Sequence, residues 1–386
     1  MSKQFFQIEL LHAAHGDCIW IEYGNANRTR RVLIDGGPIG QYKCLESKIN
    51  TLKDGDRTFE LVVLTHVDTD HVDGLVRLFA NKKADWKFDT KDVWFNGWKH
   101  LESATLGGNQ GEFFSALINA RVGAAKWNQA FKGKTIVLPE SGPLPRIKLA
   151  DDFVVTLLSP TRDTLTRMKK AWQKDVKAFV PGDLEAAWAA LAQQKKYLPN
   201  KTLLGSTPDM DALLEKQATP DNSAANGSSI AFLAEFGGHS ALLLGDAHAD
   251  VIAASLTRLL AERGLKCLQV DAVKVAHHGS KANISDDLLA LIDSPNFLIS
   301  TNGAIFEHPD TEAIQRIIAR SVHQPPTLHL NYRTPFTDKW DDPTLKDELG
   351  YEVVYNNSDV EPMKIRLESV GPRGCLSKTK NSAQTQ

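Results

Sequence analysis

Four potential metal ligands lie within six residues of one another: His66, Asp68, Asp70 and His71. Imidazole plus carboxylate is the ligand set of zinc, manganese or iron, and a majority of carboxylates shifts the preference toward harder ions. An apolar run at residues 61–64 stands directly before them, which predicts a buried strand followed by a loop. We therefore expect these side chains at the mouth of a sheet. The alternative is a chance cluster on a solvated loop.

Two further candidate ligands, Asp246 and His277, also follow apolar runs, at residues 241–245 and 270–276. Three predicted strand ends would then converge on one site. Strand-like runs that alternate with helical patterns predict an α/β layered architecture with its site at the strand ends. A carboxylate shared by two cations holds them close together, and such a pair can generate a hydroxide nucleophile and stabilise a leaving oxygen. That chemistry is hydrolytic.

Several short motifs occur in a fixed order along the chain. They are Gly16-Asp17-Cys18, Val32-Leu33-Ile34-Asp35-Gly36-Gly37, Thr65-His-x-Asp-x-Asp-His71, Leu242-Leu243-Leu244-Gly245-Asp246, Val275-Ala276-His277-His278-Gly279-Ser280 and Glu307-His308-Pro309. With these motifs the chain resembles the metallo-β-lactamase superfamily from residue 5 to about residue 335. Asp68 stands where a second histidine is usual, and this variant looks like the ComEC-type branch. The resemblance implies an αββα sandwich with a helical insertion.

The resemblance also implies two divalent metal ions, zinc or manganese, as cofactors. His66 and Asp68 would hold the first ion. Asp70, His71 and His277 would hold the second, and Asp246 would bridge the two. The superfamily's third histidine of the first site has no counterpart, because residues 154–160 contain none and His100 is the only histidine between His71 and His239. The first site is therefore expected to be one protein ligand short.

Four residues are candidates for other roles at the same site. Asp70, His278 and His308 are expected to act in catalysis, and His308 would bind a substrate phosphate or protonate a leaving group. The alternative for His308 is a loop histidine before a helix. Asp35 would orient a metal-binding histidine by a hydrogen bond, or else serve only as a turn residue.

The other histidines lack comparable spacing and are expected to be structural or exposed: His12, His15, His100, His239, His248, His323 and His329. His248 stands out among them because it lies two residues after Asp246.

Length alone, 386 residues, suggests two or three domains. The resemblance implies instead one hydrolase domain, residues 1–370, with a helical and polar insertion at 161–225 that would overhang the site. In this insertion, amphipathic patterns predict helices at 167–179 and 184–192, and Trp172 and Trp188 are expected to pack in the interior. Residues 371–386 are polar and predict a disordered tail.

The composition limits which classes of binding partner and which cellular location we expect. The net charge of −2, from 45 basic and 47 acidic side chains, gives no overall basic field for long nucleic acid. No apolar run reaches 18 residues and the start of the chain has no secretory pattern, so we expect a cytoplasmic protein without a membrane partner. The 4 cysteines are too few for a disulfide framework or a thiolate cluster and are expected to be plain core or surface residues.

The favoured function is a metal-dependent hydrolase, a phosphodiesterase or nuclease acting on nucleic acid or nucleotides through a metal-bound hydroxide. The phosphodiester preference comes from the branch resemblance. One alternative is hydrolysis of a small ester, lactone or thioester. Another is an accessory or regulatory subunit that retains the fold in a multi-protein system. The sequence leaves a protein partner or a homo-oligomer open.

Overall fold

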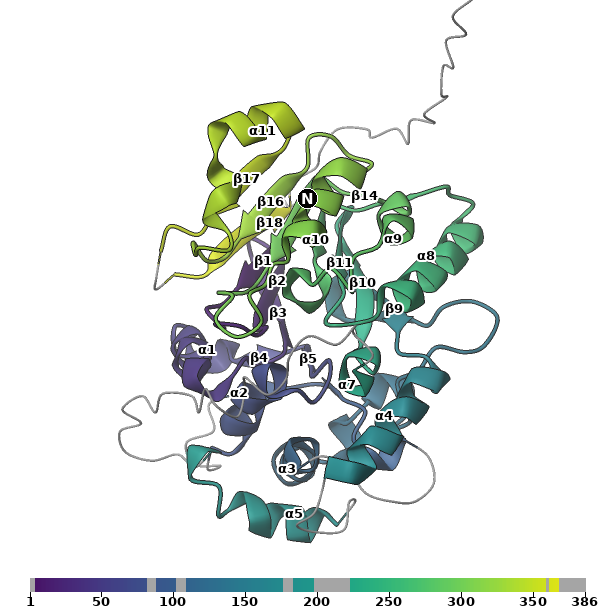
Figure 1. Cartoon of the computed structure of the whole chain (residues 1–386). Helices are drawn as coiled ribbons and strands as arrows, with labels where there is room; N and C mark the ends of the chain where they lie inside the picture. Colours follow the sequence, from purple (N-terminus) through teal and green to yellow (C-terminus); the bar gives the residue numbers. More distant parts are fainter. Residues whose placement is uncertain are drawn as a thin grey trace, which may run out of the picture.

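The computed structural model describes residues 4–81, 88–101, 109–175, 183–197, 223–358 and 361–367. Two large sheets pack face to face, and helices cover the outer face of each (Figure 1). The predicted α/β layered architecture is therefore confirmed, with the helix–sheet–sheet–helix order of an αββα sandwich. The predicted tail at 371–386 lies outside the described residues, as do residues 198–222 of the predicted insertion.

The first sheet has the strand order β18-β1-β2-β3-β5-β7. Its strands are β1 (Gln4–Leu10), β2 (Ile19–Asn25), β3 (Arg28–Ile34), β5 (Leu61–Val63), β7 (Val93–Trp94) and β18 (Met363–Leu367). Strands β1 to β3 form an antiparallel meander, and β5 and β7 run parallel to β3. Side chains alternate between the two faces, so Ile21 faces the second sheet and Trp20 faces the outer helices. Those helices are α1 (Tyr42–Asn50), α2 (Thr69–Phe79) and α3 (Asn109–Leu117).

The second sheet has the strand order β17-β16-β15-β13-β11-β10-β9-β8. Its strands are β8 (Arg146–Lys148), β9 (Val154–Ser159), β10 (Ala231–Phe236), β11 (His239–Leu243), β13 (Ala272–Lys274), β15 (Asn296–Ile299), β16 (Thr327–Leu330) and β17 (Glu352–Tyr355). Strands β11, β13 and β15 run parallel, so their carboxyl ends meet at one edge of the sheet. The helices on this side are α8 (Ala249–Arg263), α9 (Asp286–Ala290), α10 (Thr311–Arg320) and α11 (Pro343–Leu349). Two small parallel pairs complete the strands: β4 (Thr58–Phe59) with β6 (Asp89–Thr90), and β12 (Leu268–Gln269) with β14 (Ile292–Asp293).

Aromatic side chains fill the space between the two sheets. The ring of Tyr23 from the first sheet lies 4.3 Å from the ring of Phe153 and 5.0 Å from the ring of Phe236, measured between centroids. Trp94 meets Phe232 edge-on in the same layer. Large buried rings contribute much of the apolar area removed from water on folding, so this layer holds the two sheets in a fixed relation.

The described part of the insertion is helical, as predicted. It contains α4 (Arg162–Asp175), α5 (Leu184–Leu191) and the turn η9 (Lys195–Tyr197), and α7 (Ala224–Gly227) leads back into the second sheet. Helix α5 packs against α3. The packing expected for Trp188 was wrong, because its ring is 38% exposed and lies under the guanidinium of Arg121. The side chain of Trp172 lies outside the described part of the chain.

Other local expectations also need correction. Helix α2 begins at Thr69, so part of the metal-ligand motif, which was expected to be a loop, is helical. Cys18 and Cys44 are free thiols as expected, whereas Cys267 is disulfide-bonded. Among the described residues, no helix is long and apolar enough to cross a membrane.

Candidate metal centre

The first sheet supplies four candidate ligands from one short segment. His66 stands in the loop after β5, and Asp70 and His71 lie in the first turn of α2. Asp68 occupies the position before the helix, where its backbone carbonyl accepts hydrogen bonds from the amides of His71 and Val72. Its side chain makes no capping bond and stays available to the site. The predicted loop is therefore short: residues 64–68 separate the end of β5 from the first residue of α2.

The start of α2 is pressed against the loop after β3. A Cβ at Gly74 would lie 2.0 Å from the carbonyl oxygen of Gly36, so only glycine fits this contact. The amide of Gly36 donates to the carbonyl of His71 at 2.8 Å. This close approach fixes the first turn of the helix relative to the sheet.

The second sheet supplies Asp246 and two histidines. Asp246 follows β11, and His277 and His278 lie in the turn η10 (Ala276–Gly279) after β13. Both histidines have left-handed backbone, with φ of 46° and 54°. Non-glycine residues rarely adopt this conformation, which costs about 1 kcal/mol or more and is often found at functional sites.

The Oδ2 atom of Asp246 lies at the centre of the cluster. Its distances to the Nε2 atoms of four imidazoles are 3.4 Å for His71, 3.7 Å for His66, 3.8 Å for His277 and 3.8 Å for His278. The four rings come from both sheets. Asp246 is thus positioned to share its carboxylate among ligands from the two halves of the sandwich.

Two more carboxylates face the same imidazoles. Oδ2 of Asp70 lies 3.5 Å from Nε2 of His278 and 3.8 Å from Nε2 of His71. Oδ2 of Asp68 lies 3.6 Å from Nε2 of His66, but this carboxylate is 42% exposed and stands at the rim. The ligand atoms form two groups, and within each group all of them lie within 4.8 Å of one another. One group is His66, His71 and Asp246, and the other is Asp70, His71 and His278.

One buried carboxylate fixes two of the imidazoles from behind. Oδ2 of Asp35 lies 2.8 Å from Nδ1 of His71 and also accepts the hydroxyl hydrogen of Thr65 at 2.7 Å. The same hydroxyl oxygen lies 3.0 Å from Nδ1 of His66. Because Thr65 donates to Asp35, its oxygen is left to accept from His66. Both imidazoles then carry hydrogen on Nδ1 and present the bare Nε2 to Asp246.

The two histidines of the second sheet are held in the same way. Nδ1 of His278 donates to the carbonyl oxygen of Ser300 at 2.8 Å. Nδ1 of His277 lies 3.0 Å from the amide oxygen of Asn283, whose nitrogen donates to the carbonyl of Asp246 at 3.2 Å. Each imidazole therefore has a partner on its outer nitrogen.

The inner atoms fit a divalent cation. Nε2 of His66, His71 and His278 and Oδ1 of Asp246 are buried and have no hydrogen-bond partner among the described residues. A buried polar atom without a partner costs about 1–3 kcal/mol, and here three imidazole nitrogens face one carboxylate. A cation with imidazole and carboxylate ligands satisfies all of them together. The donor set is therefore that of a metal site.

The charges within the site favour added positive charge. Burial alone would raise the pKa of Asp246, but His71 and its neighbouring imidazoles hold that pKa well below its usual range. Burial opposes charge on His71, yet Asp246 and Asp70 raise its pKa well above 6.5. Burial is likewise outweighed at His278, where Asp246 and Asp17 raise the pKa to about 9. A field that favours protons on these imidazoles equally favours a metal cation.

The structure offers no third histidine for the first site within its described part. His100 is buried against the ring of Trp127, at 4.9 Å between centroids, and belongs to neither ligand group. Residues 154–159 form β9 and contribute no ligand. The group of His66, His71 and Asp246 nevertheless offers three ligand atoms.

Three further histidines lie around the cluster. The ring of His308 is 5.4 Å from the ring of His277, between centroids, so the predicted residue stands beside the site without joining either ligand group. His248 also stays outside these groups, with its ring against Gly227 of α7. Sequence reasoning missed His15. It directly precedes Gly16, whose backbone packs against the carbonyl of Asp70. Burial lowers the pKa of His15, and the charge of Asp70 partly opposes this. Its position directly before the Gly16-Asp17 motif was the available signal.

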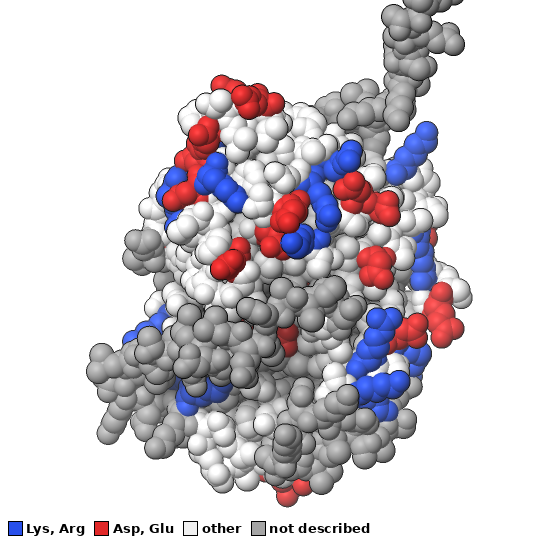
Figure 2. All heavy atoms as spheres, in the orientation of Figure 1, with Lys and Arg blue, Asp and Glu red and all other residues white. Residues whose placement is uncertain are grey.

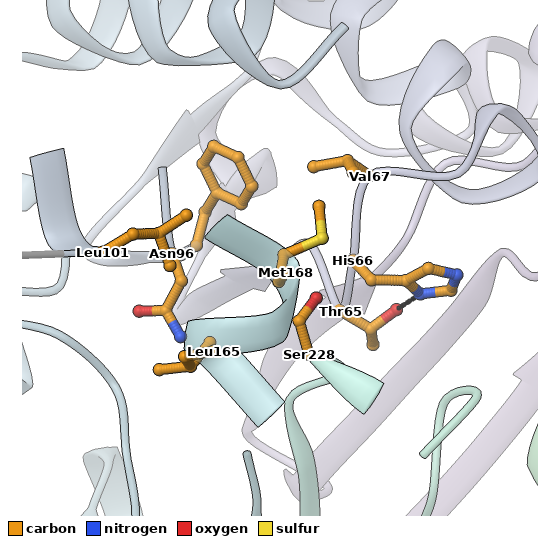
Figure 3. A pocket seen from close by; sticks show the side chains of 9 residues that line it. Thr65, His66, Val67, Asn96, Leu101, Leu165, Met168 and Ser228 are labelled. Carbon is orange, nitrogen blue, oxygen red and sulfur yellow. Dashed lines mark hydrogen bonds between the residues drawn. The ribbon is translucent and has the colours of Figure 1, made fainter. Parts of the chain in front are cut away.

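A small pocket adjoins His66 (Figure 3). It is lined by Thr65, His66, Val67, Phe95, Asn96, Leu101, Leu165, Met168 and Ser228. Leu165 and Met168 come from α4, so this helix borders the pocket. The lining mixes polar and apolar side chains: Thr65, His66 and Ser228 lie on one side, and Asn96 lies beside Leu101 on the other (Figure 3).

Charged side chains of both signs are interspersed on the face shown in Figure 2. On this face the described residues form no extended basic stripe.

Comparisons with known proteins give distant structural likeness only. No protein-family model and no curated protein sequence matches the chain. A metallo-beta-lactamase fold protein, YhfI from Bacillus subtilis, is 10% identical with a TM-score of 0.40 over 94% of this chain and 100% of that chain. A mutant of the CmlA beta-hydroxylase is 11% identical with a TM-score of 0.34 over 95% of this chain and 54% of its own. A protein of unknown function from Enterococcus faecalis V583 is 10% identical with a TM-score of 0.27 over 92% and 79%.

Proposed function

We propose that the chain is a metal-dependent hydrolase of the metallo-β-lactamase superfamily. One observation carries the proposal: four imidazole Nε2 atoms converge within 3.8 Å of Oδ2 of Asp246, while each outer Nδ1 has its own partner. A purely structural cluster would have no reason to leave buried nitrogen lone pairs facing one carboxylate.

The ligand roles are proposed from these distances. His66, His71 and Asp246 would hold one divalent ion, with Asp68 reaching it from the rim. Asp70, His71 and His278 define the second group, and His277 would join it or the bridging carboxylate. A divalent cation bound here supplies Lewis acidity toward water and toward the scissile bond.

Other residues of the chain would bind and orient the substrate. His308 stands beside His277, where its imidazole can donate a proton to a leaving oxygen or contact an anionic group. His15 lies in the loop between β1 and β2, next to Gly16, whose backbone packs against the carbonyl of Asp70. Two histidines flanking a cationic centre suit an anionic ester, and with the Thr-His-x-Asp-x-Asp-His motif they favour a phosphodiester in a nucleotide or a short nucleic acid.

A second candidate substrate class has its own support. Phe95, Leu165 and Met168 line part of the pocket beside His66, and their apolar side chains would contact an acyl group more favourably than a phosphate. A small ester, lactone or thioester therefore remains the alternative substrate. An accessory subunit that keeps the metal without turnover is the third alternative.

The test begins with metal analysis of protein purified without chelator, beside Asp246→Asn. We expect metal in the wild type and a large loss in the variant; equal, negligible content in both contradicts the proposal. Chelated protein is then reloaded with manganese or zinc and assayed on bis(p-nitrophenyl) phosphate and p-nitrophenyl butyrate. Phosphodiester turnover lost in Asp246→Asn supports the favoured function, butyrate turnover alone supports the alternative, and metal without turnover supports the accessory role.

Manganese should support activity at least as well as zinc. Three of the seven candidate ligands are carboxylates and none is a thiolate, a set that suits a hard ion. Restoration of the chelated protein by zinc alone would contradict this expectation.

A further inference from the structure

Two fully buried charged groups, Asp17 and Lys274, lie directly beneath the candidate metal centre. Both side chains are 0% exposed, and Nζ of Lys274 donates to Oδ2 of Asp17 at 2.7 Å. The same ammonium donates to the carbonyl oxygen of Val275 at 3.0 Å. The ion pair is therefore isolated from water and fixed by hydrogen bonds.

The pair joins the two halves of the sandwich. Asp17 belongs to the loop between β1 and β2 of the first sheet, and Lys274 is the last residue of β13 in the second. The loop carrying Asp17 is tightly packed against the start of α2, since a Cβ at Gly16 would lie 2.0 Å from the carbonyl oxygen of Asp70. The amide of Asp17 donates to that same oxygen at 3.3 Å.

The second oxygen of Asp17 faces a candidate ligand. Oδ1 of Asp17 lies 3.5 Å from Nδ1 of His278, on the side of the ring away from the metal centre. Nδ1 of the same ring donates to the carbonyl oxygen of Ser300, while Nε2 faces Asp70. The hydroxyl of Ser300 in turn donates to the carbonyl of Gly16 at 3.1 Å. The carbonyl of Ser300 thus holds His278 from behind by a hydrogen bond, and the carboxylate of Asp17 faces the same nitrogen.

Stability alone gives little reason for such a pair. The desolvation of two buried charges usually offsets their attraction. A protein with apolar residues of the same shape at these positions is therefore often as stable as one with the ion pair, or more stable. A carboxylate behind an imidazole, in contrast, increases the basicity of the nitrogen on the far side and fixes the ring orientation. The distances therefore indicate that the carboxylate of Asp17 orients the imidazole of His278.

We propose that Asp17, anchored by Lys274, is a positioning residue that aims Nε2 of His278 into the metal centre and fixes the spacing between its two halves. The proposal rests on the metal centre described under the proposed function. It concerns the affinity and the geometry of metal binding, and it assigns neither residue a contact with substrate.

The test compares Asp17→Asn, Lys274→Met and the double variant with wild type. Metal affinity is measured by competition with a chromophoric chelator, ligand geometry by the visible spectrum of the cobalt-loaded protein, and stability by thermal unfolding of the metal-free protein. Asp17→Asn should bind metal about 10–100-fold more weakly and change the cobalt spectrum. The double variant, which removes both charges, should recover stability relative to the single variants but not the lost affinity.

Glu9→Gln provides a matched control. Glu9 is a buried carboxylate of the first sheet, 1% exposed, and pairs with Nζ of Lys48 at 2.6 Å, outside both ligand groups. This variant should change stability and leave both metal affinity and the cobalt spectrum unchanged.

Two results would overturn the inference. The first is an Asp17→Asn variant that binds metal within two-fold of the wild-type affinity and has an unchanged cobalt spectrum. If the single variants do not fold, the same result in the double variant counts equally. Either result would show that the pair is purely structural. Wild-type protein that binds no metal would overturn the proposed function, and the inference with it. The first result leaves the proposed function intact, so the two failures are distinguishable.

Discussion

Asp35 and His71 form the shortest contact between a candidate ligand and its supporting side chain, with Oδ2 and Nδ1 separated by 2.8 Å and both side chains 0% exposed. The same Oδ2 accepts the Thr65 hydroxyl, which contacts His66. A single carboxylate therefore orients two imidazoles of the centre. The backbone of Asp35 has φ of 59°, a conformation retained where the surrounding structure demands it.

The first prediction compares the contact of Asp35 with His71 and the contact of Thr65 with His66. Asp35→Asn should weaken metal binding about 10–100-fold, because His71 loses its carboxylate partner and the Thr65 hydroxyl that contacts His66 loses the carboxylate that orients it. Thr65→Val should have a smaller effect, because it releases His66 alone. Chelator competition measures both variants. If Asp35→Asn and wild type bind metal with equal affinity, Asp35 serves only as a turn residue.

The second prediction ranks two histidines. His71 belongs to both ligand groups and is fully buried, whereas the side chain of His277 is 19% exposed and lies 3.8 Å from Asp246. His71→Ala should therefore remove nearly all bound metal, and His277→Ala only part of it. Elemental analysis after gel filtration measures the difference. The opposite order would contradict the ligand roles proposed above.

The third prediction concerns His308. If this imidazole acts on the substrate, His308→Ala should retain metal and lose about 10²–10⁴-fold in turnover. His323→Ala, which alters an imidazole paired with Asp293 away from the ligand groups, serves as the control. Turnover within a few-fold of wild type would give His308 a structural role, and loss of metal would make it a ligand.

The fourth prediction concerns pH and stability. Burial lowers the pKa of His329 to about 4, whereas in the unfolded chain it titrates near 6.5. The unfolded state thus takes up a proton first as the pH falls, so this stabilising contribution is complete above 6.5 and is lost between 6.5 and 4. The slope is at most about 1.4 kcal/mol per pH unit.

His329→Gln should reduce that dependence, because glutamine does not titrate. Urea unfolding at about pH 7 and about pH 4.5 measures the free energy of unfolding of both proteins. The wild type should lose about 1–2 kcal/mol more than the variant over this interval. An identical loss would show that His329 takes up its proton equally in the folded and unfolded states.

Local sequence patterns predicted the parts of the site that depend on strand ends. The apolar runs before His66, Asp246 and His277 indicated three strands, and all three side chains meet in the structure. The same reasoning could not orient neighbouring residues, because His277 and His278 differ by one position and both Nε2 atoms face Asp246. The left-handed backbone of the turn allows both side chains to face Asp246, and no residue type in the sequence predicts that backbone conformation.

Long-range contacts were beyond local reasoning. Asp17 and Lys274 are 257 residues apart, and only the packing of the two sheets brings them together. His15 was dismissed for lack of spacing, although its loop reaches the centre by pairing with distant backbone, such as the amide of Asn302 donating to Ala14. The C-terminal strands β16, β17 and β18 are short, and their parallel or remote partners give them weak signals in sequence.

The pairing of β18 with β1 has a consequence for biosynthesis. Leu367 lies opposite Phe6, so the edge of the first sheet stays uncovered until nearly the whole described chain has left the ribosome. A nascent chain exposes that strand edge to other chains in the meantime. His278, however, is synthesised well before β18. A metal ion captured at that stage would join the two sheets early and shorten the period in which the growing chain can associate wrongly.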